Sequence, residues 1–371
     1  MSKTLQDYAT LINDTIQSNE INHYITTDNM CQNLGGIDTF KNINIPQGKV
    51  RSFQKDDILL SNIRLYFRKV YRAKQKGGCS SDVLVFRAKH IDSATLFAIL
   101  SSQIFTDYAC SGSQGSKMPR GNKTHMMDFK IPTINFTIAK IFNSIQNKIE
   151  NNHKINELLH KILELLYEQY FVRFDFLDEN NKPYQTSGGK MKFSKELNRL
   201  IPNDFEVKTL GELTQLKVGN KNANHSSDQG KYPFFTCSNN PLKCETYQFE
   251  GKHIIISGNG NFYVTHYDGK FDAYQRTYVV NPNNPNHYVL IYLFVKSYTN
   301  YLKLQSRGSI IKFITKSDIE NIKIVLPNLK TYTKWNNVLK MIENNMQSTQ
   351  TLTVLRDFLL PLLLKQQVKP K

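Results

Sequence analysis

The chain has 371 residues, of which 48 are Lys or Arg and 31 are Asp or Glu, so its formal net charge is +17. This length is enough for two or three domains, and a hydrophobic content of 40% is enough to build cores. The sequence contains no apolar run long enough for a transmembrane helix and no apolar signal core at its N-terminus, which predicts a cytoplasmic protein. The positive charge favours a polyanionic partner, although a Lys-, Asn- and Ile-rich proteome would produce the same bias.

The cysteines and histidines give no metal-binding pattern. The five cysteines form no close CxxC pair, and the nine histidines show no HExxH spacing. This argues against a zinc ribbon, a disulfide framework and a zinc hydrolase, so we expect free or buried thiols and no metal site. The cysteines are Cys31, Cys79, Cys110, Cys237 and Cys244.

Residues 1–132 predict a first domain of mixed α/β structure. A turn at 55–57 precedes the apolar run Ile58-Leu59-Leu60, and Val83-Leu84-Val85-Phe86 has the composition of a short strand. Apolar residues over 94–108 recur at helical spacing, and glycines with one proline indicate a loop over 112–121.

The most basic stretch of this domain runs from Arg64 to Lys76 and contains six cations and no acid. As a strand it would present five cations on one face and Leu65, Phe67 and Tyr71 on the other. Such a face could contact phosphates, and the alternative is a solvated edge strand that is protected by its charge. The five cations are Arg64, Arg68, Arg72, Lys74 and Lys76.

Residues 133–201 predict a first long helix followed by a linker. No proline or glycine occurs over 133–172, where apolar residues recur three and four positions apart, as in a heptad seam. At 1.5 Å per residue, about 40 helical residues would make a rod of roughly 60 Å. Residues 173–201 are polar and contain Pro183 and two glycines, which is typical of a linker. The predicted seam consists of Ile138, Ile141, Ile145, Ile155, Leu159, Ile162 and Leu166.

Residues 202–330 repeat the α/β pattern and predict a second domain, and residues 331–371 predict a second long helix with a C-terminal tail. Ile254-Ile255-Ile256 matches the apolar run of the first domain, and 288–304 matches its helix. Pro361 should kink or end the second long helix. The predicted seam of that helix consists of Val338, Met341, Leu352, Leu355 and Leu359.

Short sequences recur about 193 residues apart and predict an internal pseudo-twofold repeat. Ile149-Glu150-Asn151-Asn152 recurs as Ile342-Glu343-Asn344-Asn345, and both copies lie in the predicted long helices. Further repeated pairs are Gly115-Ser116 with Gly308-Ser309, and Ile131-Pro132 with Leu326-Pro327. Asn152 and Asn345 both take position a of a heptad, so we predict two antiparallel helices with these residues in the seam, fixing the register. The alternative is that both face solvent.

Three short stretches resemble enzyme motifs but lack some of their residues. Ser257–Phe262 looks like a phosphate or methyl-donor loop, but a strand-like run follows it, so a tight strand turn is the better interpretation. Asn281–Pro285 lacks the adjacent prolines and the aromatic residue of an amino-methyltransferase motif. Asp204–Lys208 lacks the upstream acid of a metal nuclease and is interpreted as an exposed strand edge.

Several polar and cationic side chains have the chemistry to read DNA. Asn and Gln pair bidentately with adenine and Arg with guanine, while Lys and Arg also contact phosphates. An ordinary turn or surface role is the alternative for each of them. In the first domain the candidates are Asn62, Arg64, Arg68, Arg72, Ser80, Ser81, Lys117 and Arg120, and in the second they are Ser238, Asn239, Asn240, Asn259, Asn261, Tyr274, Gln275, Arg276, Arg307 and Lys312.

Over nearly its whole length the chain resembles the specificity (S) subunit of type I restriction–modification systems. The resemblance is carried by Tyr24–Met30, by Gly77–Phe86, by the linker segments Phe174–Tyr184 and Ser187–Met191, and by Ile201-Pro202 leading to Val207–Leu213. In the second half it is carried by Ile255–Gly260, Phe271–Thr277 and Phe358–Leu364. The opening of the first domain, Leu5–Ala9, departs from the family's pattern.

This resemblance implies an α/β (α+β) chain without catalytic residues. It implies two target-recognition domains of mixed sheet and helices, joined by two long antiparallel coiled-coil helices. Each domain would read half of a bipartite duplex DNA target, with the helices acting as the ruler. It further implies two methyltransferase (modification) subunits that bind S-adenosylmethionine, and restriction subunits that use ATP and Mg²⁺, with no cofactor bound by this chain. The alternative hypotheses are a self-contained DNA methyltransferase and a basic RNA-binding scaffold.

Overall fold

The structure is a computed structural model that describes residues 3–38, 43–131, 134–238, 240–308, 311–327, 332 and 334–363. The described part of the chain contains no helix with the length and hydropathy needed to cross a membrane. The chain divides into two compact units, here called unit 1 (residues 1–155 with 344–371) and unit 2 (residues 156–343). Of the residues in the repeats and motifs above, Pro132, Asn239, Ser309 and Leu364 lie outside the described residues.

Unit 1 contains two four-stranded sheets, in the orders β1-β8-β5-β6 and β2-β4-β7-β3. All pairs are antiparallel except β3 with β7, so the unit is mixed. The strands are β1 Ala9–Ile12, β2 Thr15–Gln17, β3 Tyr24–Ile25, β4 Lys49–Phe53, β5 Ile58–Ser61, β6 Val70–Arg72, β7 Gly77–Cys79 and β8 Val83–Ala88.

The apolar run of β5 is explained by the two cores of unit 1. Side chains alternate across a strand, so Ile58 and Leu60 enter one buried cluster, whereas Leu59 enters another. The first cluster also contains Leu96 and Phe97 of the helical layer. A central strand that is buried on both faces needs consecutive apolar residues, which is the pattern seen in the sequence.

The helices of unit 1 differ from the single helix expected over 94–108. The chain forms α2 and α3 there, because Ser102 has extended backbone and its side chain accepts a hydrogen bond from the Phe105 N–H as the cap of α3. The short helices of unit 1 are α1 Leu5–Tyr8, η1 Ser18–Glu20, η2 Leu65–Phe67, α2 Ser93–Ser101, α3 Gln103–Ser111 and α4 Lys123–Met127.

The prediction of one basic strand over 64–76 is wrong. Arg64 and Arg68 have φ near 50°, in the left-handed region, and they flank the 3₁₀ turn η2. Only Val70–Arg72 of this stretch is a strand, β6. The five cations therefore do not share one face, because strand alternation holds only over continuous extended backbone.

Unit 2 is built on a six-stranded sheet in the order β12-β17-β15-β16-β13-β14, with two further strand pairs, β10-β9 and β11-β18. Ile254 and Ile256 of β15 enter one core and Ile255 enters the other, as in β5 of unit 1. The strands are β9 Met191–Ser194, β10 Arg199–Pro202, β11 Glu206–Thr209, β12 Thr214–Val218, β13 Tyr232–Phe235, β14 Leu242–Cys244, β15 Phe249–Ser257, β16 Val264–Ala273, β17 Thr277–Pro282 and β18 Lys323–Leu326. The short helices are α6 Leu210–Leu213, η4 Ala223–His225, η5 Pro285–His287 and α8 Lys316–Glu320, and the longer one is α7 Tyr288–Gln305.

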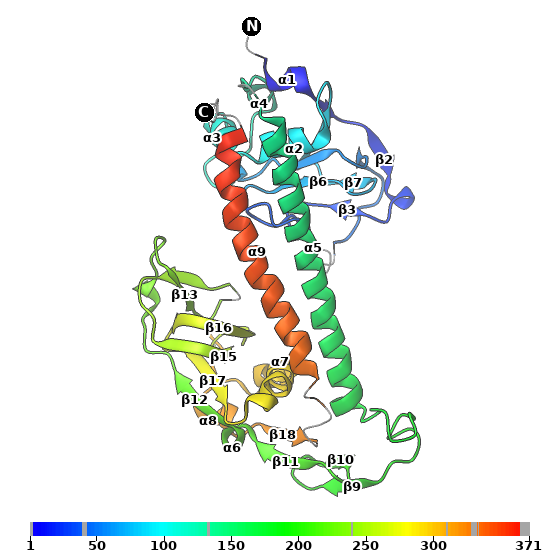
Figure 1. The fold of residues 1–371 in the computed structure, drawn as a ribbon, viewed down its shortest axis with the longest axis vertical. Coiled ribbons are helices and arrows are strands. Elements are labelled where there is room, and N and C mark those ends of the chain that lie inside the picture. The colour runs from blue at the N-terminus through cyan, green and yellow to red at the C-terminus, as the bar shows by residue number, and fades with distance from the viewer. Residues whose placement is uncertain are drawn as a thin grey trace. The chain divides into compact units, whose positions relative to one another are not determined.

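The two long helices of Figure 1 are α5, Phe136–Tyr167, which continues into the π-helical turn η3, Glu168–Val172, and α9, Trp335–Leu363. They are antiparallel within each unit. In unit 1 the contacts join Asn135 with Leu363, Gln146 with Arg356 and Asn152 with Thr349, and in unit 2 Asn156 donates to the Ile342 carbonyl. Pro361 lies inside α9 and does not end it.

The seam between these helices is rotated from the predicted one. The predicted a positions Ile138, Leu159 and Val338 are partly buried. In contrast, Ile141, Ile155, Ile162, Met341 and Leu355 are exposed, at 41–52%. A buried residue directly follows three of these exposed residues, at Phe142, Leu163 and Ile342, whereas the predicted a position Ile145 is itself buried at 8% exposure. Hydrophobic periodicity alone could not separate these positions, because apolar residues occupy two adjacent rows of α5.

Both units repeat the same local elements. Leu5 donates its N–H to the Phe129 carbonyl and Leu210 donates to the Ile322 carbonyl, at 2.9 and 2.8 Å. Each of these leucines opens a short helix, α1 or α6, that follows a threonine capping box. The divergent opening of the first domain is therefore structurally equivalent to that of the second. The mixed α/β class, the antiparallel long helices and the internal repeat are confirmed.

Candidate nucleic-acid interface

In unit 1, several of the predicted DNA-binding residues meet at the end of β5. The Asn62 N–H donates to the Asp82 carbonyl at 2.8 Å, and Gly121 donates to the Asn62 carbonyl at 3.1 Å. Arg120 forms an ion pair of 3.0 Å with the Asp82 carboxylate. Three loops, 62–64, 80–82 and 117–121, are thus joined by backbone hydrogen bonds, and we call them turn cluster 1.

The cations of turn cluster 1 differ in how they are held: Arg64 is partly buried and bonded to backbone carbonyls, whereas Lys117 and Arg120 are exposed. The Arg64 N–H donates to the Pro119 carbonyl at 2.9 Å, and its guanidinium donates to the Lys117 carbonyl at 3.4 Å. Lys117 and Arg120 are exposed, as is Ser81, while Ser80 is partly buried. Arg120 is paired with Asp82, whereas the Arg64 guanidinium donates to a backbone carbonyl and keeps its positive potential, which suits contact with phosphates.

Arg68 and Arg72 do not join this cluster. Arg68 donates to the Ser101 carbonyl of α2 at 2.9 Å, and burial lowers the pKa of its guanidinium. Arg72 pairs with Asp56 at 3.1 Å and donates to the Asn143 side chain of α5 at 2.8 Å. These contacts lie inside unit 1, so the two arginines stabilise its packing in this structure.

Unit 2 forms an equivalent group of loops at the end of β15. Gly258 donates to the Arg276 carbonyl at 2.7 Å, and Gly260 donates to the Lys312 carbonyl at 2.8 Å. Ile314 donates back to the Gly258 carbonyl at 3.0 Å. The loops 258–261, 274–276 and 307–313 form turn cluster 2, of which Ser309 and Ile310 lie outside the described residues.

The same bridges define both clusters. In unit 1, Arg120 pairs with Gln114 and with Ile63, and in unit 2, Phe313 pairs with Arg307 and with Asn259. Gly115 and Gly308 both have a positive φ, 97° and 101°, which a residue with a side chain rarely adopts. The repeated glycine therefore serves a turn that both units need.

The predicted reading residues of unit 2 lie on or beside turn cluster 2. Asn261, Gln275, Arg276, Arg307 and Lys312 are exposed, and Tyr274 and Asn259 are partly buried. The Cys237 thiol contacts the Arg276 carbonyl at 3.5 Å, which brings the exposed Ser238 next to the cluster. Asn240 is exposed, and Asn239 lies outside the described residues. Ser257–Phe262 is the turn between β15 and β16, as predicted.

Each cluster contains a buried asparagine oxygen with no hydrogen-bond partner among the described residues, and in turn cluster 1 the Arg64 Nε is also without one. The two oxygens are those of the Asn62 and Asn259 side chains. An unpaired buried acceptor is costly, and each such group in a native structure calls for an explanation, for example a bound water or ion. The amino groups of adenine and cytosine are donors that such an oxygen could accept from.

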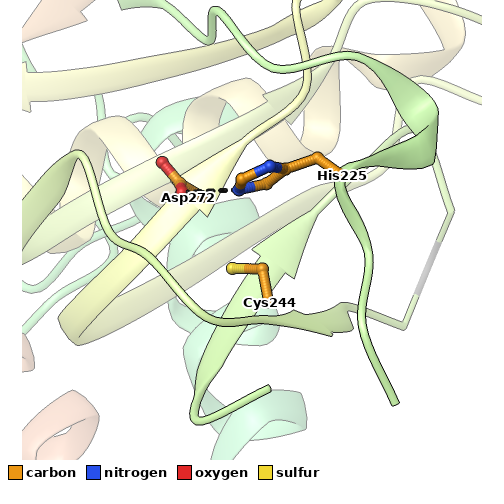
Figure 2. A group of neighbouring side chains, drawn as sticks. All are labelled: His225, Cys244 and Asp272. Atoms are coloured by element: carbon orange, nitrogen blue, oxygen red, sulfur yellow. Dashed lines mark hydrogen bonds and ion pairs between the residues drawn. The ribbon is translucent and has the colours of Figure 1, made fainter. Parts of the chain in front are cut away.

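A cluster that the sequence analysis missed lies elsewhere in unit 2. Figure 2 shows the ring of His225 directed at the Asp272 carboxylate, with Cys244 beside them. His225 Nε2 lies 3.0 Å from Asp272 Oδ2, and the Thr246 hydroxyl donates to the same oxygen at 2.6 Å. The three groups are far apart in sequence, so no spacing rule could have found them.

The chemistry of this cluster does not favour a metal ion. The Cys244 sulfur contacts the carbonyl oxygens of Tyr232, Pro233 and Thr246 at 3.2–3.8 Å, and burial raises the pKa of its thiol. Zinc binds the thiolate, which these oxygens would repel. We interpret the group as a hydrogen-bonded anchor that ties η4 and β14 to the buried carboxylate of β16.

Comparison with known proteins finds a family match for the second half of the chain, which contains turn cluster 2. Residues 202–354 match the family described as the type I restriction modification DNA specificity domain. The chain is 36% identical over 133 residues to the specificity subunit of the type I restriction enzyme EcoDI of Escherichia coli, covering 34% of this chain and 29% of that protein. It is 24% identical over 298 residues to the MjaIX specificity subunit of Methanocaldococcus jannaschii, covering 72% and 67%.

The fold also has a solved relative. The S subunit of a type I restriction–modification system from M. genitalium superposes with a TM-score of 0.61 over 99% of this chain and 96% of that one, at 16% identity. The match covers less than a third of the EcoDI subunit's length, and at such low identity the M. genitalium structure supports the fold alone. The resemblance seen in the sequence is confirmed, and residues 202–354 match the type I restriction modification DNA specificity domain.

Proposed function

We propose that the chain is the non-catalytic DNA-recognition subunit of a type I restriction–modification complex. Turn cluster 1 and turn cluster 2 each read one half of a bipartite target. The continuous helices α5 and α9 set the spacing between the two half-sites. The observation that carries this proposal is the recurrence of one loop framework, with exposed cations and amides, at equivalent places in both units.

The proposed partners are two identical methyltransferase subunits that dock on the long helices. Exposed apolar residues recur at equivalent positions on these helices, Ile162 with Leu355 and Leu165 with Phe358. Exposed apolar groups on both copies of a repeat suit two copies of one partner, because equivalent surfaces bind equivalent surfaces. Restriction subunits would join this core.

The cofactors in this proposal belong to the partners. S-adenosylmethionine would bind the methyltransferase subunits, and ATP with Mg²⁺ would bind the restriction subunits. The strand turn at Ser257–Phe262 leads into β16 rather than into a helix, so it lacks the helix N-terminus with which a methyl-donor or dinucleotide loop holds its ligand. A chromosomal target places the complex in the cytoplasm.

The decisive experiment co-expresses the chain with its methyltransferase partner in a methylation-free host and sequences the methylated adenines. We expect one motif with two defined halves and a fixed non-specific spacer. A continuous motif, or methylation without sequence preference, would contradict the proposal. Clear binding of S-adenosylmethionine to the isolated chain would favour a self-contained methyltransferase, and tighter binding of RNA than of duplex DNA would favour an RNA scaffold.

A single substitution tests the assignment of turn cluster 2. Arg276→Ala should weaken methylation through one half-site by about 10- to 100-fold and relax its sequence, because an Arg–guanine contact contributes about 1–3 kcal/mol of discrimination. The other half-site should remain unchanged. Lys270→Ala is the matched control, since Lys270 of β16 pairs with Glu250 away from the cluster.

A further inference from the structure

The repeated Ile-Glu-Asn-Asn sequence has the same structural environment in both units. The isoleucines, Ile149 and Ile342, are almost completely buried, with 2% and 0% exposure. Asn151 and Asn344, in the third position, are exposed in both copies. Packing on the seam explains the isoleucine but not the glutamate that follows it.

Each repeated glutamate forms an ion pair with a lysine of the recognition domain in its own unit. In unit 1, Lys74 Nζ lies 3.2 Å from Glu150 Oε2. In unit 2, Lys252 of β15 contacts both oxygens of Glu343, at 2.9 and 3.0 Å. The two lysines stand at different places in the domains, after β6 and within β15, so the helix glutamate is the element that the two units share.

A second contact recurs seven residues earlier on the same face of each helix. Asn143 accepts a hydrogen bond from Arg72 of β6 at 2.8 Å. At the equivalent position in unit 2, Asn336 donates to the Asn286 carbonyl at 3.1 Å. Residues seven apart lie two turns apart on one helix face, so each helix presents an Asn and a Glu as a two-point docking row.

Both ion pairs are partly buried, so each should contribute more to the position of its domain than an exposed ion pair would. Glu150 is 8% exposed, and its second oxygen accepts from Gln146 at 3.2 Å. Beside Glu343, His266 lies at 3.6 Å, and because burial lowers its pKa to about 3 it is neutral near pH 7. Lys252 is therefore the cation that balances Glu343, and partial burial makes such a pair sensitive to geometry.

We propose that Glu150 and Glu343 are equivalent positioning residues that fix the orientation of each recognition domain on its long helix. This inference rests on the proposed function and deepens it. If a domain changes its orientation on its helix, the distance between the two turn clusters varies. The complex would then accept half-sites at several spacings. Neither glutamate contacts DNA in this proposal, because each acts through its lysine.

The test measures methylation by the complete complex on duplexes with the two half-sites at the native spacing and at one base pair more or less. For Glu150→Gln and Glu343→Gln, the preference for the native spacing should fall by about tenfold, and more in the double variant, while the half-site sequences stay unchanged. The charge swaps Lys74→Glu/Glu150→Lys and Lys252→Glu/Glu343→Lys should restore much of it. Glu168→Gln is the matched control, since Glu168 at the end of the same helix pairs with the nearby Arg173 rather than with a lysine of a recognition domain.

The possible results distinguish a failure of the positioning role from a failure of the proposed function. If the wild-type complex shows no preference for any spacing, the proposed function fails. If the wild type is selective and the glutamine variants keep its spacing profile, the positioning role is wrong. The fluorescence of Trp335, the only tryptophan in the sequence, reports whether unit 2 is folded. If a glutamine variant fails to fold, the charge-swap variant is used to test the inference instead. A folded swap that remains permissive also overturns the inference.

Discussion

The two units use the same helix seam with opposite chemistry at equivalent positions. In unit 1, the Arg356 guanidinium is 2% exposed and donates to the Gln146 side chain at 3.1 Å. The positions 193 residues away, Leu163 and Leu339, are both fully buried in the apolar core of unit 2. A repeated backbone therefore supports a polar pair in one unit and an apolar pair in the other.

The difference shows which parts of the repeat the structure constrains. A buried polar pair contributes more to the specificity of packing than to stability. A polar pair and an apolar pair can therefore both fill this position between the two helices. The docking residues, in contrast, are identical in both copies: Asn143 with Asn336, and Glu150 with Glu343. These seam positions differ between the two copies, whereas the helix residues that contact the recognition domains are the same, although their partners in the domains differ.

The turn clusters show the same division between backbone and side chains. The bridges to Arg120 and to Phe313 are equivalent, but one residue is a cation and the other is aromatic. Gln114 likewise corresponds to Arg307. A common framework with different exposed groups is what two readers of different half-sites require.

The largest expected effect on stability comes from placing the polar residue of the unit 1 seam in unit 2, and the apolar residue of unit 2 in unit 1. Leu163→Arg should destabilise unit 2 by about 4 kcal/mol, because a buried guanidinium there would lack the acceptor that Gln146 supplies in unit 1. Arg356→Leu leaves the buried Gln146 side-chain oxygen without this donor and should lower the stability of unit 1 by about 1–2 kcal/mol. Hydrogen exchange in each unit measures both, and equal effects would mean that the seams are not chemically distinct.

The next effect concerns the anchor of η4 and β14, found in unit 2. His225→Ala should destabilise this edge of the sheet by about 3 kcal/mol, because it removes a hydrogen-bond partner of a carboxylate that is fully buried. His225→Asn keeps a hydrogen-bond donor and should cost less. Faster hydrogen exchange confined to β13 and β14 is the expected signature, and unchanged exchange would contradict the role of this contact.

A smaller effect is the pH dependence of the stability of unit 2. Burial lowers the pKa of His266 from its ordinary 6.5 to about 3, so the unfolded chain takes up a proton well before the folded one does. The stability from neutral burial is complete above pH 6.5 and falls below it, by about 2 kcal/mol at pH 5. Trp335 fluorescence in urea should show this loss in unit 2, and His266→Phe should reduce it.

Much of this organisation was predictable from local pattern. The repeat of Ile-Glu-Asn-Asn located both long helices, and the apolar runs at 58–60 and 254–256 located the central strands, because a strand buried on both faces leaves a continuous signal. The turn at Ser257–Phe262 followed from its glycines and the strand-like run behind it. The reading roles of individual residues in the turn clusters remain predictions.

The remainder depended on tertiary structure. The basic stretch 64–76 has strand-like composition, but left-handed backbone at Arg64 and Arg68 breaks it, and no sequence rule requires that conformation at arginine. The heptad phase was ambiguous because apolar residues occupy two adjacent rows of α5. The group of His225, Cys244 and Asp272 joins residues up to 47 positions apart, which only the sheet brings together.

The measurement that tests the central claim most directly is the spacing of the methylated motif after one heptad is inserted into both α5 and α9. Seven helical residues add about 10.5 Å, so the preferred spacer should lengthen, by up to about 3 base pairs, while both half-site sequences stay the same. A variant that methylates the original spacer with unchanged preference would show that the helices do not set the distance between the two recognition domains.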